Sequence, residues 1–77
     1  LGYDKAALRI LEQSSQTAET QYMQAILNAR LGNEQRAVSL LLSAAEADDR
    51  IRFRANLDPE LSLLVKKYGL FKEDDLW

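Results

Sequence analysis

Residues able to do chemistry are few in this chain, and their spacing matches no catalytic or metal-binding arrangement. The sequence contains no cysteine and no histidine, so it lacks the commonest general base, the commonest protein metal ligand and any disulfide. Carboxylates gather at Glu46, Asp48 and Asp49, and again over residues 73–75. Neither cluster has the alternate carboxylates and central glycine of a calcium loop, and a chain this small cannot enclose the cleft that glycoside chemistry requires. We therefore expect solvated charge in both clusters, no cofactor and no enzymatic activity.

Three arginines at alternate positions, Arg50, Arg52 and Arg54, form the main basic cluster of the sequence. Because guanidinium groups pair with phosphates and carboxylates, a site for phosphate or an acidic peptide is one interpretation. The other is structural, since Arg50 and Arg54 share one helix face close to Asp48 and Asp49. The near balance of charge, −2 overall, favours the structural interpretation and makes nucleic acid an unexpected partner.

Helices are the elements that must position these residues. The composition is 47% hydrophobic, with one proline and three glycines, which is typical of a small globular helical domain. Apolar residues recur at helical spacing rather than in strict alternation. Ile51 and Phe53 alternate with arginines and imitate a strand, but one strand without a partner is not stable. The pattern predicts helices at residues 3–13, 18–31 and 34–47, a short one within 48–56, and one starting at Pro59 and ending before Gly69.

Capping residues mark the ends of these helices. Thr17 is a suitable N-cap for the second helix, and Gly32 a left-handed residue that ends it. Asn33 is then expected to cap the third helix. Asp58 followed by Pro59 predicts a further helix start, because proline costs no hydrogen bond at the first helical position.

Each predicted helix has an apolar face. The first carries Ala7, Leu8, Ile10 and Leu11 on one side. The third has apolar residues on two flanks, as an inner helix of a stacked array does. No apolar run reaches the roughly 18 residues of a membrane helix, and no signal-peptide pattern opens the chain. We therefore expect a soluble domain in an undetermined compartment. Because the chain opens on Leu1, we expect it to be a fragment or a processed product.

The junctions before Ala6 and Ala37 are similar, each with a glycine, polar residues and an alanine that opens an apolar helix. The two alanines are 31 residues apart, near the period of about 34 in tetratricopeptide repeats. Residues 22–48 carry the match. It consists of Tyr22, Ala25, Arg30 to Asn33 at the turn, Ala37, Leu41, Ala44 and Asp48. On these residues the sequence resembles the tetratricopeptide repeat family.

The resemblance implies a fold and a division of the chain. The fold is all-α, with antiparallel helical hairpins stacked as a short right-handed superhelical segment. Residues 1–16 would be the second helix of a truncated repeat, 17–48 a full repeat, 49–69 a degenerate closing unit and 70–77 a tail. Small residues at Ala25, Ala37 and Ala44 would let the helix axes approach closely. The aromatic residue expected near the start of the first helix is absent, and Asp49 stands where proline usually follows the second.

The resemblance also implies a function, which is to hold a protein or peptide partner without catalysis. The first helix of each repeat lines a concave groove in this family, and the corresponding residues are Glu19, Met23, Ile26 and Arg30. Alternatively, Ile26 is core, Met23 packs on a neighbour, and Glu19 and Arg30 are solvated. The residues that clamp a peptide carboxylate in chaperone-binding members are not matched, because Met23 and Ile26 occupy two of those places.

A second function stays open, in which the segment is a structural C-terminal cap of a longer array and upstream repeats do the binding. The role of the tail also has two interpretations. Leu70, Phe71, Leu76 and Trp77 either fold over the last helix or form an exposed docking patch.

Overall fold

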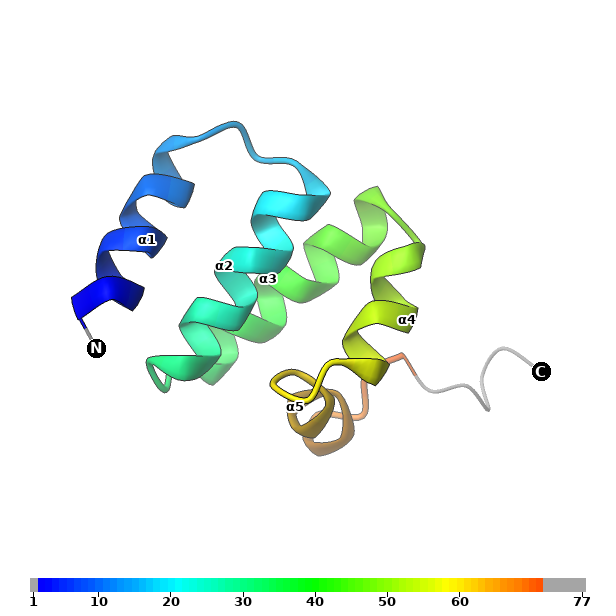
Figure 1. Ribbon diagram of the computed structural model, residues 1–77. Coiled ribbons are helices and arrows are strands. Elements are labelled where there is room, and N and C mark those ends of the chain that lie inside the picture. Colours follow the sequence, from blue (N-terminus) through cyan, green and yellow to red (C-terminus); the bar gives the residue numbers. More distant parts are fainter. Residues whose placement is uncertain (1, 72–77) are drawn as a thin grey trace.

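The computed structural model describes residues 2–71, and this part of the chain is built from helices without a strand. The helices are α1 (Gly2–Gln13), α2 (Ala18–Arg30), α3 (Glu34–Ala47), α4 (Arg50–Leu57) and α5 (Ser62–Lys67). Each helix packs against the next one in sequence, and α1 to α4 run alternately up and down (Figure 1). The all-α prediction is confirmed, and so is the short helix predicted where Ile51 and Phe53 alternate with arginines, because these residues belong to α4.

Residues at both ends of α2 fix its length. The backbone N–H of Thr20 donates to the Thr17 hydroxyl, and the Thr17 N–H donates to the Thr20 hydroxyl, so the predicted N-cap forms a reciprocal capping box. At the other end Gly32 has a φ of +84°, as predicted. The Asn33 N–H then donates to the Asn28 carbonyl at 2.8 Å, which closes a Schellman turn.

Asn33 is the N-cap residue of α3, as predicted, but its side chain makes no capping hydrogen bond. Its side-chain amide instead donates to Asn28 Oδ1 at 3.4 Å. The turn therefore draws Asn33 toward the end of α2, away from the first N–H groups of α3.

The α2–α3 hairpin forms the centre of the hydrophobic core. Ala25, Ala37 and Ala44 have no exposed surface, and neither has Leu41. Tyr22 is also buried and belongs to the same cluster, together with residues of α4 and α5. Small side chains between the two helices let their backbones approach closely, and the larger Tyr22 and Leu41 fill the remaining space.

The start of α5 differs from the prediction. The N–H groups of Leu61 and Ser62 both donate to the Asp58 carbonyl, so the chain makes a tight turn before α5 begins at Ser62. Asp58 does cap this turn, because its Oδ1 accepts from the Glu60 N–H at 2.8 Å. Pro59 therefore lies in the turn and not at the first helical position. The turn brings Leu61, which is completely buried, into the core.

The last described residues pack on the core. Gly69 has a φ of +64° and ends α5 as predicted, with the Leu70 N–H donating to the Val65 carbonyl. Leu70 and Phe71 are partly buried against the core cluster. The expected positions of Leu76 and Trp77 lie outside the described residues.

Candidate functional site

Helix α1 packs on α2 through one side only, and none of its described side chains is fully buried. Ala7, Leu8 and Leu11 are half-buried, whereas Ile10 is 65% exposed and Tyr3 is 91% exposed. Ile10, which the apolar pattern places on the same side as these three residues, is therefore not covered. Ile10 lies about 100° around the helix from Leu11, and the described helices that contact α1 do not cover that sector. The outer side of α1 is thus an uncovered apolar surface.

A groove separates α1 from α2. Its volume is about 220 Å³, and its lining residues are Ala7, Leu11, Met23, Ile26, Leu27 and Arg30. Five of these six side chains are apolar. Met23 is 43% exposed, while Ile26 is partly buried against the core cluster. The groove is therefore an apolar hollow with one cation at its rim.

Three of the four residues predicted to bind a partner, Met23, Ile26 and Arg30, line this groove. Ala7, Leu11 and Leu27 also line the groove and were not predicted from the sequence. The sequence does indicate that Ala7 and Leu11 pack on something, because they are four residues apart on the apolar face of the first helix. Periodicity alone does not show which neighbouring helix that face contacts.

Glu19, the fourth predicted residue, is not among the residues that line the groove. Its carboxylate accepts a hydrogen bond from Arg54 Nη1 at 2.7 Å, which joins the start of α2 to α4. This hydrogen bond, with the attraction of the guanidinium charge, lowers the pKa of Glu19. The structure therefore gives Glu19 a partner within the chain.

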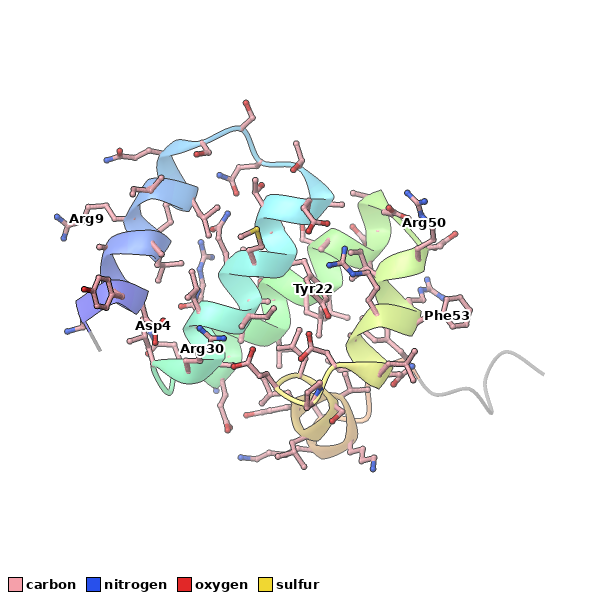
Figure 2. The ribbon with its side chains drawn as sticks, in the orientation of Figure 1. Asp4, Arg9, Tyr22, Arg30, Arg50 and Phe53 are labelled. Carbon is pink, nitrogen blue, oxygen red and sulfur yellow. The ribbon has the colours of Figure 1, made fainter. Side chains whose placement is uncertain are left out.

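Arg30 is held at the rim by two carboxylates from different parts of the fold. Its Nε and Nη2 donate to the two oxygens of Glu60 at 2.6 and 3.0 Å. Its Nη1 donates to Asp4 Oδ1 at 3.4 Å. The side chains of Asp4 and Arg30 lie near each other between α1 and α2 (Figure 2). Arg30 thus connects α1, α2 and the turn before α5, and its charge is compensated locally.

The arginine cluster of α4 is engaged in ion pairs, as the structural interpretation expects. Arg50 pairs with Asp48 at 2.9 Å, and Arg52 with Asp49 at 3.8 Å. The hydrogen bonds from Arg50 lower the pKa of Asp48. Arg54 pairs with Glu19, as described above. The cluster therefore carries little uncompensated positive charge for a phosphate or an acidic peptide.

Tyr22 links α2 to the turn before α5. Its hydroxyl donates to Asp58 Oδ2 at 2.8 Å, and the Arg54 guanidinium lies 4.4 Å from the centre of its ring. Burial and the hydrogen bond to Asp58 both raise the pKa of Tyr22. The phenol is protonated at neutral pH, so it is a structural hydrogen-bond donor and not a base.

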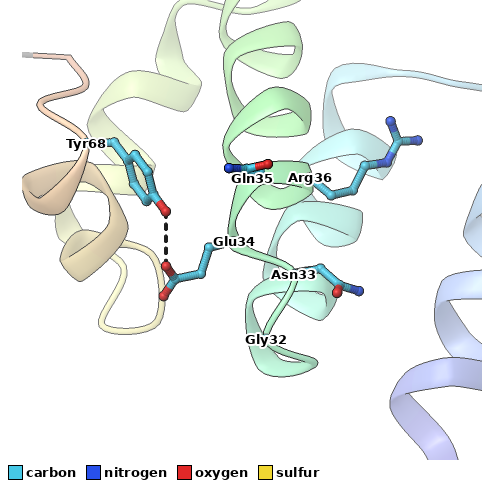
Figure 3. Close-up of a pocket in the computed structure, with 6 residues that line it drawn as sticks. All are labelled: Gly32, Asn33, Glu34, Gln35, Arg36 and Tyr68. Atoms are coloured by element: carbon cyan, nitrogen blue, oxygen red, sulfur yellow. Dashed lines mark hydrogen bonds between the residues drawn. The ribbon is translucent and has the colours of Figure 1, made fainter.

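A second hollow lies where α5 approaches the start of α3. It has a volume of about 470 Å³, and its lining residues are Gly32, Asn33, Glu34, Gln35, Arg36 and Tyr68 (Figure 3). The Glu34 carboxylate accepts from Lys67 at 2.7 Å and from the Tyr68 hydroxyl at 3.1 Å. These bonds lower the pKa of Glu34, the one from Lys67 most strongly. Glu34 and Lys67 neutralise each other, and the hollow, which Arg36 also lines, lacks the apolar lining of the groove.

Residues 2–71 show no membrane-spanning helix and no metal centre. No helix in this range is long and apolar enough to cross a membrane. No group of three or more acidic residues in the same range is arranged to hold a metal ion. Comparison of the chain with protein-family models, curated proteins and solved structures found no match.

Proposed function

We propose that this chain is a protein-interaction module of the tetratricopeptide type, which holds part of a partner protein in the α1–α2 groove. The groove itself is the observation that carries the proposal. It is apolar, it is open to solvent at Met23, and its lining includes three residues predicted to bind a partner. Its volume of about 220 Å³ is below the roughly 300–1,000 Å³ of small-molecule sites. Apolar side chains of a protein partner suit a hollow of this size better than a whole ligand does.

The packing of the helices supports a tetratricopeptide-like stack. Consecutive helices pack against each other, and α2 and α3 meet through Ala25, Ala37 and Ala44. In this family α2 and α3 would be the two helices of one repeat. Helix α1 would be the second helix of the repeat before, and α4 and α5 a degenerate closing unit. The right-handed superhelical stacking is part of the proposal.

A structural cap of a longer helical array is the second candidate. The exposed Tyr3 and Ile10 favour it, because a helix at an internal boundary of an array carries such a face. The C-terminal helices α4 and α5 argue against the cap. Terminal caps present a polar outer surface, whereas α4 and α5 expose Phe53, Leu57 and Leu63. The intact mass of the protein from its native source distinguishes the binding module from the cap. A mass that includes several further repeats supports the cap.

Selection of displayed peptides tests the binding proposal. Clones selected against the wild-type chain are measured again on Met23→Glu and on Leu63→Glu. Leu63 is a matched control, because it is also an exposed apolar residue on a helix but lies on α5, outside the groove lining. We expect Met23→Glu to abolish binding and Leu63→Glu to preserve it, with unchanged helical circular dichroism in both. Selection of clones that bind all three proteins equally would contradict the proposed site.

A further inference from the structure

We infer that α1 is a movable wall of the groove, which opens from α2 as one unit while α2 to α5 stay folded, and that Gln16 holds it closed. The inference rests on the proposed function, because it names what regulates access to that groove. Three features of the molecule carry it: the shallow burial of α1, the side-chain bonds that attach α1 to α2, and the share of the groove that α1 contributes.

The contact between α1 and α2 is shallow compared with the packing of the other helices. Among residues 3–13 of α1 no side chain is buried, and Ala7, Leu8 and Leu11 are half-buried. Each of α2, α3, α4 and α5 contributes buried residues. Elements that bury few apolar contacts open at a lower free energy than the core does. We therefore expect α1 to open more easily than the α2–α3 hairpin unfolds.

Gln16 links the last turn of α1 to the body of α2. It lies in the segment 14–17 that joins the two helices (Figure 1). Its side-chain Nε2 donates to the Leu11 carbonyl at 3.2 Å and to the Ser14 carbonyl at 2.8 Å. Its Oε1 accepts from Gln24 Nε2 at 2.8 Å, and Gln24 is only 1% exposed. One exposed side chain therefore joins the end of α1 to a buried amide of α2.

The burial of Gln24 makes this link important for the closed position. A buried donor without a partner costs free energy, whereas the same donor in water does not. While α1 is closed, Gln16 supplies the partner of the Gln24 amide. The bond from Arg30 to Asp4, at 3.4 Å, attaches α1 nearer its other end. Helix α1 is thus held by side-chain bonds at both ends and by half-buried apolar residues between them, so we expect it to move as one piece.

Opening of α1 removes one wall of the groove. Ala7 and Leu11 belong to α1, whereas Met23 and Ile26 belong to α2, and all four line the groove. An occupant that contacts both walls binds only the closed form. Opening therefore lowers the apparent affinity in proportion to the closed fraction, and a bound occupant in turn suppresses opening.

Native-state hydrogen exchange of the whole chain tests the opening without any partner. The amides of Ala7, Leu8 and Leu11 are compared with those of Leu41 and Ala44 in α3. We expect protection factors in α1 to be similar to one another and at least about tenfold lower than in α3. They should also depend less on urea, because a local opening exposes less surface than global unfolding does. Equal protection and equal urea dependence in the two helices would overturn the inference, and so would protection that falls steadily toward one end of α1.

Replacing Gln16 with alanine tests which residue holds α1 closed. Gln13→Ala is the matched control, because it removes another exposed glutamine side chain, at the end of α1. We expect Gln16→Ala to lower protection throughout α1 about fivefold or more, since the Gln24 amide loses its partner, and to leave α3 unchanged. Gln13→Ala should change protection by less than about twofold. Equal effects of the two variants, or an equal loss of protection in α1 and α3 of Gln16→Ala, would contradict the role of Gln16.

A selected peptide separates the regulation of the groove from its proposed function. The peptide is one that binds the wild-type chain and loses binding to Met23→Glu. At about ten times its Kd it should slow exchange in α1 about tenfold. Unchanged exchange in α1 at saturation would overturn the regulatory role of α1 while the binding function stands. Failure to select any peptide sensitive to Met23→Glu would overturn the proposed function, whereas the partner-free exchange experiment decides whether α1 opens.

Discussion

Replacing Tyr22 with phenylalanine tests the contact that joins α2 to the turn before α5. The change removes one hydroxyl, whose hydrogen bond to Asp58 Oδ2 is 2.8 Å long and connects residues 36 apart in sequence. The ring and its packing in the core stay, and Arg54 can still lie over it. The measured difference therefore reports mainly the hydrogen bond.

The expected cost is about 1.5–2 kcal/mol. Hydrogen bonds to charged groups contribute about 1.5–3 kcal/mol, and the lower part of that range applies because Asp58 is only partly buried. A domain of 77 residues has a free energy of unfolding of roughly 4–12 kcal/mol, so the loss is a substantial fraction. With an m-value of about 1 kcal/mol/M, the urea midpoint followed by circular dichroism should fall by about 1.5–2 M.

Tyr3→Phe is the matched control, because it removes the same hydroxyl from a residue that is 91% exposed. We expect it to leave the free energy of unfolding within about 0.3 kcal/mol of the wild type. Equal effects of the two substitutions would refute the role assigned to the bond between Tyr22 and Asp58. So would a loss below about 0.5 kcal/mol for Tyr22→Phe.

Alkaline pH gives the same test a second readout. Burial, followed by the hydrogen bond to Asp58, raises the pKa of Tyr22 in the folded state. Above the unfolded-state pKa of about 10, the unfolded chain releases this proton while the folded chain keeps it. Stability is therefore present below about pH 10 and is lost as the pH rises toward the folded-state pKa. The decline in stability as the pH rises above about 10 should be steeper for the wild type than for Tyr22→Phe. Parallel declines would contradict the assignment.

Three further predictions concern the packing, the turn and the ion pairs. Ala25→Leu overfills the contact between α2 and α3, where Ala25 has no exposed surface, and should cost about 1–3 kcal/mol in urea unfolding. Ala47→Leu, at an exposed position of α3, should cost less than about 0.5 kcal/mol. Gly32→Ala meets no atom within 4 Å but must keep a φ of +84°, so we expect a loss of about 1 kcal/mol from the backbone alone, seen as a lower thermal midpoint. The hydrogen bond from Lys67 lowers the pKa of Glu34, so its stabilisation is present above the unfolded-state pKa and is lost as the pH falls through the folded-state pKa. The wild type should therefore lose its stability advantage over Glu34→Gln on acid titration, and a constant difference would contradict this.

Local chemistry made several parts of the fold predictable from the sequence. Thr17 and Gly32 determine where α2 begins and ends, because each acts on backbone groups within a few residues. The same holds for Gly69 at the end of α5. At Asn33 the predicted N-cap position is correct, but the side chain makes no capping bond, and its amide group donates to Asn28 Oδ1 in the preceding helix. Local rules give the possible bonds of a residue, and the folded geometry decides among them.

The lining of the groove was predicted in part. The resemblance to tetratricopeptide repeats pointed to Met23, Ile26 and Arg30, and these residues line the groove. It also pointed to Glu19, but the partner of Glu19, Arg54, lies 35 residues away in sequence. The periodicity of α1 gave its apolar positions but not which of them α2 covers, and Ile10 stays exposed. Such pairings depend on how the helices stack, which single-helix patterns do not encode.

Amide chemical-shift mapping with one peptide selected against the wild-type chain tests the central claim most directly. The claim is that the α1–α2 groove is the surface that receives a partner. We expect the perturbed amides to cluster at Ala7, Leu11, Met23, Ile26 and Arg30, which come from the two walls of the groove. Perturbations confined to α3, α4 and α5, with these amides unchanged at saturation, would contradict the account.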